Sequence, residues 1–494
     1  MANIGFDNDK YIELQSQKIL ERISSFGGKL YLEFGGKLFD DFHAARVLPG
    51  FCPDSKIKML MSMKENAEMI IVVSATSIEQ NKMRGDLGIT YDMDTLRLID
   101  AFTGIGMYVG GVVITQYSNQ PAADAFIKRL ENLGVKVYKH YPIDGYPTNV
   151  RKIVSDDGYG KNEYIETTKP LVVVTAPGPG SGKMATCMSQ LYHDHKRGIK
   201  AGYAKFETFP IWNLPLTHPV NMAYEAATVD LSDVNMIDPF HLEATGTTAV
   251  NYNRDIEIFP VLQAIFRQIY GECTYKSPTD MGVNMAGYCI FDDKAVCDAS
   301  KMEIVRRYYD TLCRKRNGIA DSEEVYKSEL IMSKVGVDVS FRRVVKAALD
   351  KAELTGEPAA AIELGDGTIV TGKTSKLMGA SAAALLNALK SLGGIDESIL
   401  LLPAVLMEPL QKLKVENLGN NNPRLHSDEV LIALAISATT NPVAAMAMEQ
   451  LPKLRGCQAH ISVMLSNVDK TIYKKLGIDL TSEPIYATKK LYHK

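Results

Sequence analysis

The sequence predicts an α/β protein: a doubly wound, mainly parallel sheet of the Rossmann-like type, followed by a smaller C-terminal α/β domain. Short apolar runs, such as residues 69–73 and 171–174, have the unbroken hydrophobicity of strands that are buried on both faces. Amphipathic segments with helical spacing separate these runs along the first two thirds of the chain. Strands that alternate with helices form parallel sheets, because each crossover helix returns the chain to the same end of the sheet.

The predicted elements of the larger domain follow one another in a regular order. A helix over 9–25 stops at Gly27 and Gly28, and a short strand is expected between this glycine pair and the next one. The elements expected after it are strands over 69–73 and 109–117, a helix over 121–132, strands over 135–138 and 171–174, a glycine-rich turn, a helix over 184–197 and a strand over 201–206. Further helices are expected over 261–270, 302–316 and 323–334.

Polar and charged residues crowd between positions 317 and 338, which is typical of a domain boundary. We therefore predict a large domain over 1–325 and a smaller one over 326–494. The elements expected in the smaller domain are a hairpin over 360–372, helices over 376–392 and 427–440, and a strand over 460–465.

Composition narrows the classes of function. The formal net charge of the 494 residues is -3, so no overall basic field would attract nucleic acid or anionic lipid, and we expect neither as a partner. The seven cysteines contain no CxxC pair, which argues against a zinc ribbon or a thioredoxin motif. The N-terminus has no signal-peptide pattern, and no apolar stretch is both long and unbroken enough to span a bilayer. These features predict a cytoplasmic protein.

The glycine turn, residues 176–183 with the sequence Ala-Pro-Gly-Pro-Gly-Ser-Gly-Lys, carries the most specific signal. A phosphate-binding loop needs backbone N–H groups that point inward, a following helix with free N-terminal donors, and a cation. A predicted buried strand leads into this turn and a predicted helix leaves it, as a P-loop requires. The residues predicted to bind the phosphate of a nucleotide or similar ligand are Gly178, Gly180, Ser181, Gly182 and Lys183.

The turn departs from the G-x-x-x-x-G-K-[ST] pattern at both ends, where it has Pro177 and Met184. Because Met184 replaces the hydroxyl that usually holds Mg²⁺, metal-assisted hydrolysis is not expected, and a divalent metal is left open. The alternative is a structural turn that binds no ligand. Residues 367–374 fit the pattern fully, but their β-branched interior predicts a strand, so we interpret that match as false.

A second group of polar residues lies between positions 238 and 255. If residues 238–243 are extended, His241 and Glu243 point the same way, and with Asp238 they could hold a divalent metal or act as acid and base. Arg254 could orient a substrate phosphate or carboxylate. Lys205 ends a strand, where open α/β sheets bind ligands, and it completes the predicted catalytic set. The alternative is a hydrogen-bonded loop.

The glycine turn, residues 238–243 and the run Asn-Asn-Asn-Pro-Arg-Leu-His at 420–426 together resemble an uncharacterised bacterial protein family, catalogued as domain of unknown function eighteen forty-six. The resemblance covers the whole chain and implies an α/β fold. It implies no catalytic residue, because the family has no established activity. Some of its members have been labelled ATP-dependent peptidases, but this sequence has neither HExxH nor GxSxG.

Three functions fit these features. The first is a cytoplasmic enzyme that binds a nucleotide or another small phosphorylated metabolite at the glycine turn, with transferase or ligase chemistry expected over hydrolysis. The second is a non-catalytic nucleotide-binding sensor. The third is an NAD(P)-dependent oxidoreductase, for which G-x-G-x-x-G after an early strand is missing. A helix rich in small residues, 378–389, would suit either internal packing or a homo-oligomer.

Overall fold

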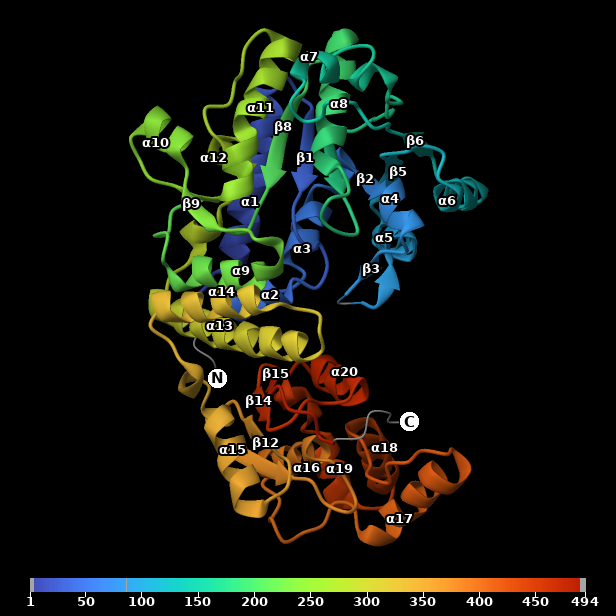
Figure 1. The fold of residues 1–494 in the computed structure, drawn as a ribbon, viewed down its shortest axis with the longest axis vertical. Coiled ribbons are helices and arrows are strands. Elements are labelled where there is room, and N and C mark those ends of the chain that lie inside the picture. Colours follow the sequence, from blue (N-terminus) through green and yellow to red (C-terminus); the bar gives the residue numbers. More distant parts are fainter. Residues whose placement is uncertain (1–3, 86, 489–494) are drawn as a thin grey trace. The chain divides into compact units, whose positions relative to one another are not determined.

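The structure of the protein is a computed structural model that describes residues 4–85 and 87–488. The chain divides into two compact units (Figure 1). The N-terminal unit contains residues 4–224 and 233–296, and the C-terminal unit contains residues 225–232 and the chain from 297 onward. The boundary predicted at 325/326 falls inside helix α14 (Ser322–Lys334). None of the helices in the described residues combines the length and the hydropathy needed to cross a membrane.

The N-terminal unit is built on a parallel sheet whose strand order is β11-β8-β1-β7-β2-β5-β6. Every neighbouring pair in this sheet is parallel, which confirms the predicted α/β class. The strands are β1 (Leu30–Phe34), β2 (Ala67–Ser74), β5 (Tyr108–Thr115), β6 (Val137–Lys139), β7 (Leu171–Thr175), β8 (Gly202–Phe206) and β11 (Gly282–Val283). β7 and β8 come late in the chain but lie on either side of β1, so their carboxyl ends meet near the centre of the sheet.

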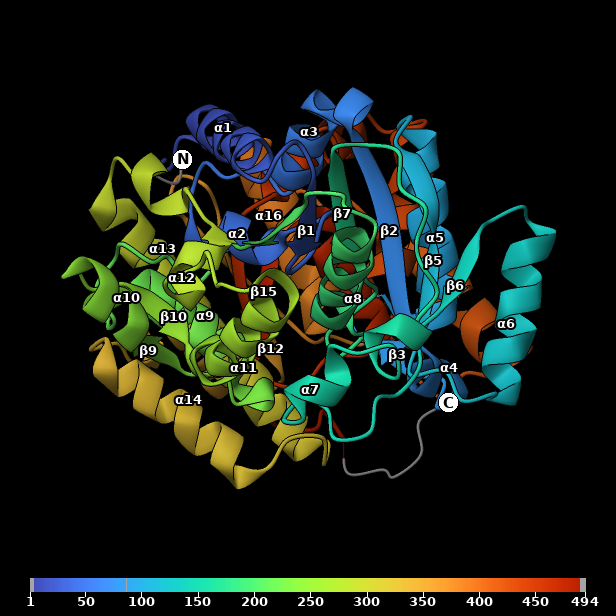
Figure 2. The ribbon, with the colours of Figure 1, turned by 90° about the horizontal axis from the view of Figure 1, so that it is seen from above.

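Helices cover both faces of this sheet. Figure 2 shows α1 and α3 on one side of the strands and α8 and α11 on the other. The helices of the unit are α1 (Asn8–Ser25), α2 (Phe42–Val47), α3 (Ser55–Ser62), α4 (Ala75–Glu79), α5 (Tyr91–Gly104), α6 (Pro121–Asn132), α7 (Val150–Ile153), α8 (Lys183–Lys196), α9 (Pro219–Ala227), α10 (Pro239–Thr245), α11 (Asn253–Tyr270) and α12 (Pro278–Met281). Two short hairpin-like pairs accompany them: β3 (Met83–Arg84) with β4 (Ile89–Thr90), and β9 (Asn235–Ile237) with β10 (Val250–Tyr252).

One sheet face positions the candidate site. The hydrophobic core on this face contains Tyr31 and Val172 from the strands, packed with Leu191 of α8 and Phe259 of α11. Side chains two residues apart on a strand share a face, so Glu33 of β1 lies on the face covered by α8. Glu33 is aligned with Val174 of β7 on one side and with Lys205 of β8 on the other.

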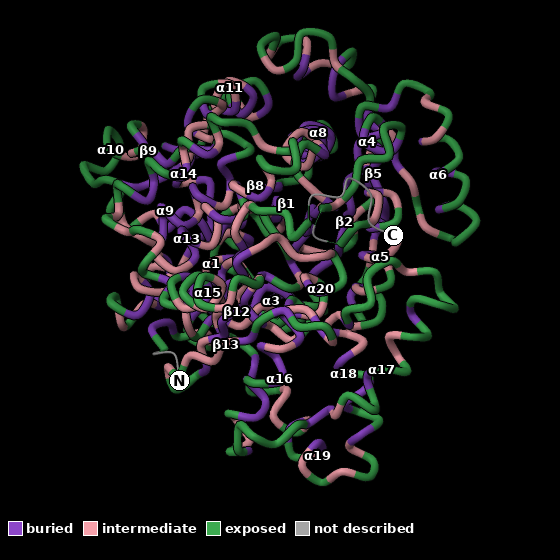
Figure 3. The backbone as a smooth tube through the Cα atoms, turned by 60° about the horizontal axis from the view of Figure 1, so that its bottom comes forward, coloured by how far each residue is buried: buried purple, intermediate pink, exposed green. Residues whose placement is uncertain are grey.

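The C-terminal unit has a mixed sheet of strand order β13-β12-β14-β15, in which only β14 and β15 pair in parallel. Its strands are β12 (Ala359–Glu363), β13 (Ile369–Lys373), β14 (Gln458–Ile461) and β15 (Asp479–Ser482). Its helices include α13 (Asp293–Arg316), α14, α15 (Arg343–Thr355), α16 (Ala380–Leu392), α17 (Ala404–Lys412), α18 (Ser427–Ala438), α19 (Pro442–Met448) and α20 (Asn467–Leu476). β12 and β13 form the predicted hairpin. Helix α16 contributes many of the buried side chains in the hydrophobic core of this unit. Figure 3 colours the backbone by the burial of each residue.

Candidate functional site

The glycine turn connects β7 to α8 at the carboxyl edge of the parallel sheet. Gly180 has φ +74° and Gly182 has φ +90°, a left-handed conformation that side chains other than that of glycine adopt only with strain. Gly178 is needed for a different reason, because a methyl group there would lie 2.2 Å from the hydroxyl oxygen of Tyr91. The three glycines therefore let the chain follow a tight path that brings its backbone close to α5.

The turn presents backbone donors without acceptors. Within the described residues, the N–H groups of residues 180–183 donate to no acceptor. Gly182 is the N-cap of α8 and offers no side-chain cap. Ser181 is only 1% exposed, and buried N–H groups without a partner are rare in proteins. Such donors at the N-terminus of a helix form a site suited to an anion, since the helix dipole also favours negative charge there.

The side chains around these donors are also arranged for a ligand. Lys183 makes no ion pair with any carboxylate in the described part of the chain. The hydroxyl of Thr186, one turn into α8, is buried and has no hydrogen-bond partner there. Cys187 on the next position is fully buried, and burial raises the pKa of its thiol well above its ordinary value. Cys187 is therefore a structural thiol rather than a reactive one.

A largely buried group of polar side chains lies at the end of β8, which is separated from β7 and the glycine turn by β1. We call Lys205, Glu207, Tyr252 and Asp255 the Lys205 cluster. The ammonium of Lys205 lies 2.8 Å from Oε1 of Glu207 and is also bonded to Asp255. The Tyr252 hydroxyl donates to the same Glu207 oxygen at 2.8 Å, while the Glu33 carboxylate accepts from Tyr203 at 2.6 Å. Lys205 thus occupies the strand-end position that was predicted for it.

The environment shifts the proton affinities in this cluster. Burial raises the pKa of Glu207 to about 7, even though the Lys205 ammonium acts against that rise. Burial disfavours the charge of Lys205, but the carboxylates of Asp255 and Glu207 outweigh it and raise the pKa of the ammonium. A carboxyl group that titrates near neutral pH, beside a fixed cation, can donate or accept a proton during a reaction.

The segment predicted to be extended around His241 is instead helix α10, so that part of the prediction is wrong. Asp238 caps this helix and its carboxylate accepts from the backbone of His241 at 3.0 Å and from the hydroxyl of Thr279 at 2.7 Å. Residues two apart on a helix point in different directions, so Glu243 does not share a face with His241. The proposed metal set of Asp238, His241 and Glu243 stays a prediction, which this helical geometry does not favour.

Two other predicted residues lie apart from the glycine turn. Figures 1 and 2 both show α10, the helix that carries His241, at one margin of the N-terminal unit, with α11 between it and α8. Arg254, at the start of α11, forms an ion pair with Asp233, with 2.6 Å between its Nη2 and Oδ2 of Asp233. Its role as a substrate clamp therefore stays a prediction. A ligand would have to compete with the Asp233 carboxylate for the Arg254 guanidinium.

Sequence reasoning missed Glu33, Glu207, Tyr252 and Asp255. One signal was available, because Glu33 is a charged residue inside the apolar strand Leu-Tyr-Leu-Glu-Phe. A carboxylate is rarely placed in such a strand unless it has a partner or a function. Tyr252 and Asp255 were hidden by distance in the sequence, since they reach Lys205 from 47 and 50 residues away. Glu207 lies only two residues after Lys205, and no role was assigned to it from the sequence.

Comparison with known proteins gives one clear result. The model described as "Domain of unknown function DUF1846, N-terminal" matches residues 4–336, and its C-terminal counterpart matches residues 340–492. The chain belongs to this family. Among DUF1846 relatives, a UPF0371 protein of Streptococcus pyogenes serotype M5 is 57% identical over 494 residues, and one of Streptococcus thermophilus is 58% identical. Both alignments cover 100% of each chain, which confirms the resemblance noted in the sequence.

Proposed function

We propose that this DUF1846 protein is an enzyme that binds a nucleotide or another small phosphorylated molecule at the glycine turn and transfers or joins a group on it. The observation that carries the proposal is the set of unpaired N–H donors at residues 180–183. A phosphate there would accept from these donors, including the one on buried Ser181, and so satisfy groups that have no partner among the described residues. Lys183 would neutralise part of the phosphate charge.

The Lys205 cluster supports a catalytic role over simple binding. Glu207 would move a proton to or from the reacting group, because its pKa of about 7 allows both protonation states near neutral pH. Lys205 would stabilise the charge on that group. We assign the acid–base role to Glu207 rather than to His241 or Glu243, since those two belong to α10, which lies at a margin of the unit with α11 between it and α8.

The residues at the start of α8 favour one type of reaction over another. Met184 stands where a P-loop hydrolase has the hydroxyl that holds Mg²⁺. The nearest alternative, the Thr186 hydroxyl, is buried. Group transfer or ligation is therefore favoured over hydrolysis of a nucleoside triphosphate. A cytoplasmic location fits the cysteines, because none of the seven forms a disulfide in the described residues, as is usual in a reducing compartment.

The binding part of the proposal is tested by thermal unfolding of the full chain, followed by tryptophan fluorescence. Trp212 is the single tryptophan and lies in the N-terminal unit, so it reports on the unit that carries the turn. Nucleotides, sugar phosphates and NAD(P) are compared, each with and without Mg²⁺. A ligand at about 100 times its Kd should stabilise the fold by about 2.7 kcal/mol.

Two lysines give a matched pair of variants. Lys183→Ala should abolish the shift, whereas Lys373→Ala should keep it, because the Gly-Lys-Thr of residues 372–374 ends strand β13 and forms no turn before a helix. Equal shifts in both variants, or no shift with any phosphate compound, would refute binding at the glycine turn.

A third variant separates an enzyme from a sensor. Glu207→Gln keeps an acceptor for the Tyr252 hydroxyl but cannot exchange a proton. In an enzyme, this variant should bind the ligand found in the screen and lose turnover of it. If the wild type turns over no compound that it binds, the catalytic part fails and the protein is a sensor.

A further inference from the structure

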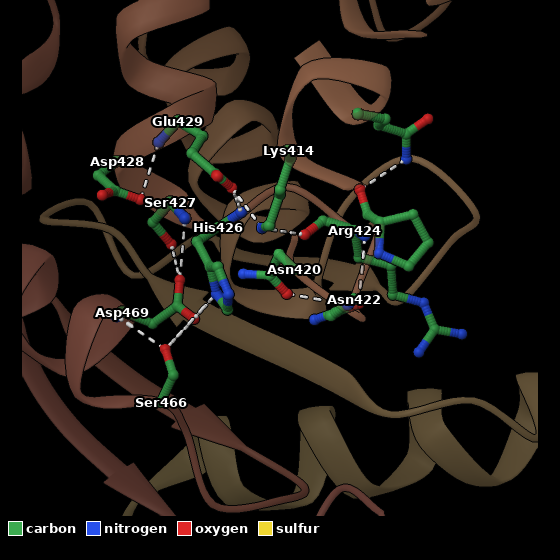
Figure 4. A network of polar contacts seen from close by, with 12 residues as sticks. Lys414, Asn420, Asn422, Arg424, His426, Ser427, Asp428, Glu429, Ser466 and Asp469 are labelled. Atoms are coloured by element: carbon green, nitrogen blue, oxygen red, sulfur yellow. Dashed lines mark hydrogen bonds and ion pairs between the residues drawn. The ribbon is translucent and has the colours of Figure 1, made fainter. Parts of the chain in front are cut away.

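A second polar site lies in the C-terminal unit, in the loop over residues 420–426. Its sequence is the Asn-Asn-Asn-Pro-Arg-Leu-His run that helped to indicate the family. The loop follows a π-helical turn, Leu413–Asn417, and leads directly into α18 (Figure 4). Single π-helical turns occur often at functional sites. The loop is not part of the proposed glycine-turn site, which lies in the N-terminal unit.

The imidazole ring of His426 is held in place by a hydrogen bond at its Nδ1 atom. Nδ1 donates to Oδ2 of Asp469 over 2.9 Å. The Asp469 carboxylate is fixed in turn, because it also accepts from the hydroxyls of Ser466 at 2.8 Å and Ser427 at 2.6 Å. This arrangement orients the ring and leaves Nε2 on the opposite edge. No described residue bonds to Nε2, and the side chain is 27% exposed.

The side-chain oxygens of two loop asparagines accept hydrogen bonds from the backbone of the loop. Oδ1 of Asn420 accepts from the backbone of Asn422 at 2.9 Å, and Oδ1 of Asn422 accepts from the backbone of Arg424 at 3.2 Å. The carbonyl oxygen of Arg424 accepts from the buried ammonium of Lys414 at 2.8 Å. The amide N–H₂ groups of both asparagines have no acceptor among the described residues. The side chains of Asn420 and Asn422 therefore leave their N–H donors uncommitted.

Arg424 adds a cation to this set. Its Nε donates to the carbonyl of Ser375 at 3.1 Å, and its two terminal nitrogens bond to no described residue. Leu425 between Arg424 and His426 is buried, 1% exposed, and pairs with Met378 in a short bridge. In such an extended stretch the neighbours of a buried residue face the other way, so both side chains point outward. Figure 4 shows Asn420 and Asn422 between them.

We propose that residues 420–426 form an oxyanion site, which takes the phosphate or carboxylate group of a small ligand. Its donors are Nε2 of His426, the guanidinium of Arg424 and the amides of Asn420 and Asn422. A surface that offers a guanidinium and several uncommitted N–H donors is complementary to an oxygen-rich anion, because each of these donors can then make a hydrogen bond. The planar guanidinium favours phosphate and carboxylate in particular.

The charges around His426 decide when Nε2 carries a proton. The groups that face it are Asp469 on α20, Glu429 on α18 and Lys414 on the π-helical turn. The hydrogen bond with Asp469 is the main cause that raises the pKa of His426, while the Lys414 charge acts against it. Glu429 is itself paired with Lys414 at 2.7 Å. An anion at Nε2 favours the protonated ring, so binding of the anion and of the proton must reinforce each other.

The test is a pH titration of the His426 ring by NMR in the full chain with labelled histidine, assigned with His426→Gln. Sulfate keeps its charge across the titration, so it is compared with chloride at equal ionic strength. We expect sulfate to raise the pKa of His426 by about 0.5–1 unit relative to chloride. Phenyl phosphate and benzoate then identify the class, because they share a ring and differ in the oxyanion. If none of the three anions moves the titration, the proposal is wrong.

Two arginines provide the control. Arg424→Met should remove most of the shift caused by sulfate, while the titration in chloride stays as in the wild type. Arg455→Met, at an exposed arginine elsewhere in the same unit, should keep the full shift. If Arg424→Met also keeps the full shift, sulfate acts through the overall charge of the protein, and the proposed site is refuted. Lys183→Ala should not alter the shift, which separates this site from the glycine turn.

Discussion

The hydroxyl of Thr115, at the end of β5, donates a hydrogen bond of 2.7 Å to the carbonyl oxygen of Ser181. β5 and β7 are not neighbours, since β2 lies between them, so this bond spans the carboxyl edge of the sheet. In a trans peptide the carbonyl and the following N–H point in opposite directions. By fixing the carbonyl of Ser181 toward β5, Thr115 turns the N–H of Gly182 away from it, toward the open side of the turn.

Thr115→Val removes this bond and keeps the shape of the side chain. The carbonyl of Ser181 then loses its partner in a buried setting, and we expect the free energy of unfolding to fall by about 1 kcal/mol. Urea unfolding followed by Trp212 fluorescence measures the change in the N-terminal unit. Thr103→Val, at an exposed hydroxyl on α5, should cost much less; an equal loss would mean that the Thr115 bond does not hold the turn.

Gly180→Ala tests the turn against a matched glycine. Gly180 and Gly134 have φ values of +74° and +75°, and at neither position does an atom of the described residues lie within 4 Å of an added methyl group. Each alanine variant should therefore lose about 1 kcal/mol through backbone strain alone. Only Gly180→Ala should also reduce the thermal shift caused by a phosphate ligand. The proposed binding site would be contradicted by a normal shift in Gly180→Ala.

The stability of the N-terminal unit should depend on Glu207 in a defined pH window. Burial raises the folded-state pKa of Glu207 to about 7 from an ordinary value of 4.5, so the folded chain holds this proton where the unfolded chain has lost it. Stability then falls as pH rises between these two values. In Glu207→Gln this part of the slope should be missing. The check is the difference between the two urea-unfolding curves from pH 4.5 to 7.5; parallel curves would argue against a raised pKa.

Asp469→Asn should loosen the start of α18. Burial alone would raise the pKa of Asp469, because it disfavours the charged carboxylate. Hydrogen bonds from His426 and Ser427 outweigh this effect and hold the pKa well below its ordinary range. Hydrogen bonds to a charged group are worth about 1.5–3 kcal/mol each, so replacing the charge should speed amide exchange over 427–438. Asp428→Asn, whose side chain bonds only the next backbone N–H among the described residues, serves as the control and should change exchange little.

Long periodic segments were predictable from the sequence. The helix expected over 121–132 is α6, and the runs at 69–73 and 171–174 lie inside β2 and β7, because local hydrophobic spacing decides them. α10 was missed although Asp238 as N-cap, Pro239 at the first position and Gly246 after the last are ordinary helix signals. Its polar composition hid them. β11 has two residues and is fixed only by its pairing with β8.

The candidate site was predictable in part for the same reason. The glycine turn and Lys205 could be found because each depends on its place beside a strand. Two partners of Lys205 come from other elements, and only the folded chain brings Asp255 and Tyr252 to it. Equally, no spacing rule links His426 to Asp469, which lie 43 residues apart.

The division of the chain has a consequence for synthesis on the ribosome. Residues 225–232 belong to the C-terminal unit, yet they are made before residues 233–296, which complete the N-terminal unit. Val229 in this segment is buried in the finished protein, within a unit whose remaining chain starts at residue 297. The nascent chain therefore carries this segment, with Val229, without the rest of its unit while at least 64 further residues are added, counted from 233 to 296. That interval is where a chaperone would be needed most.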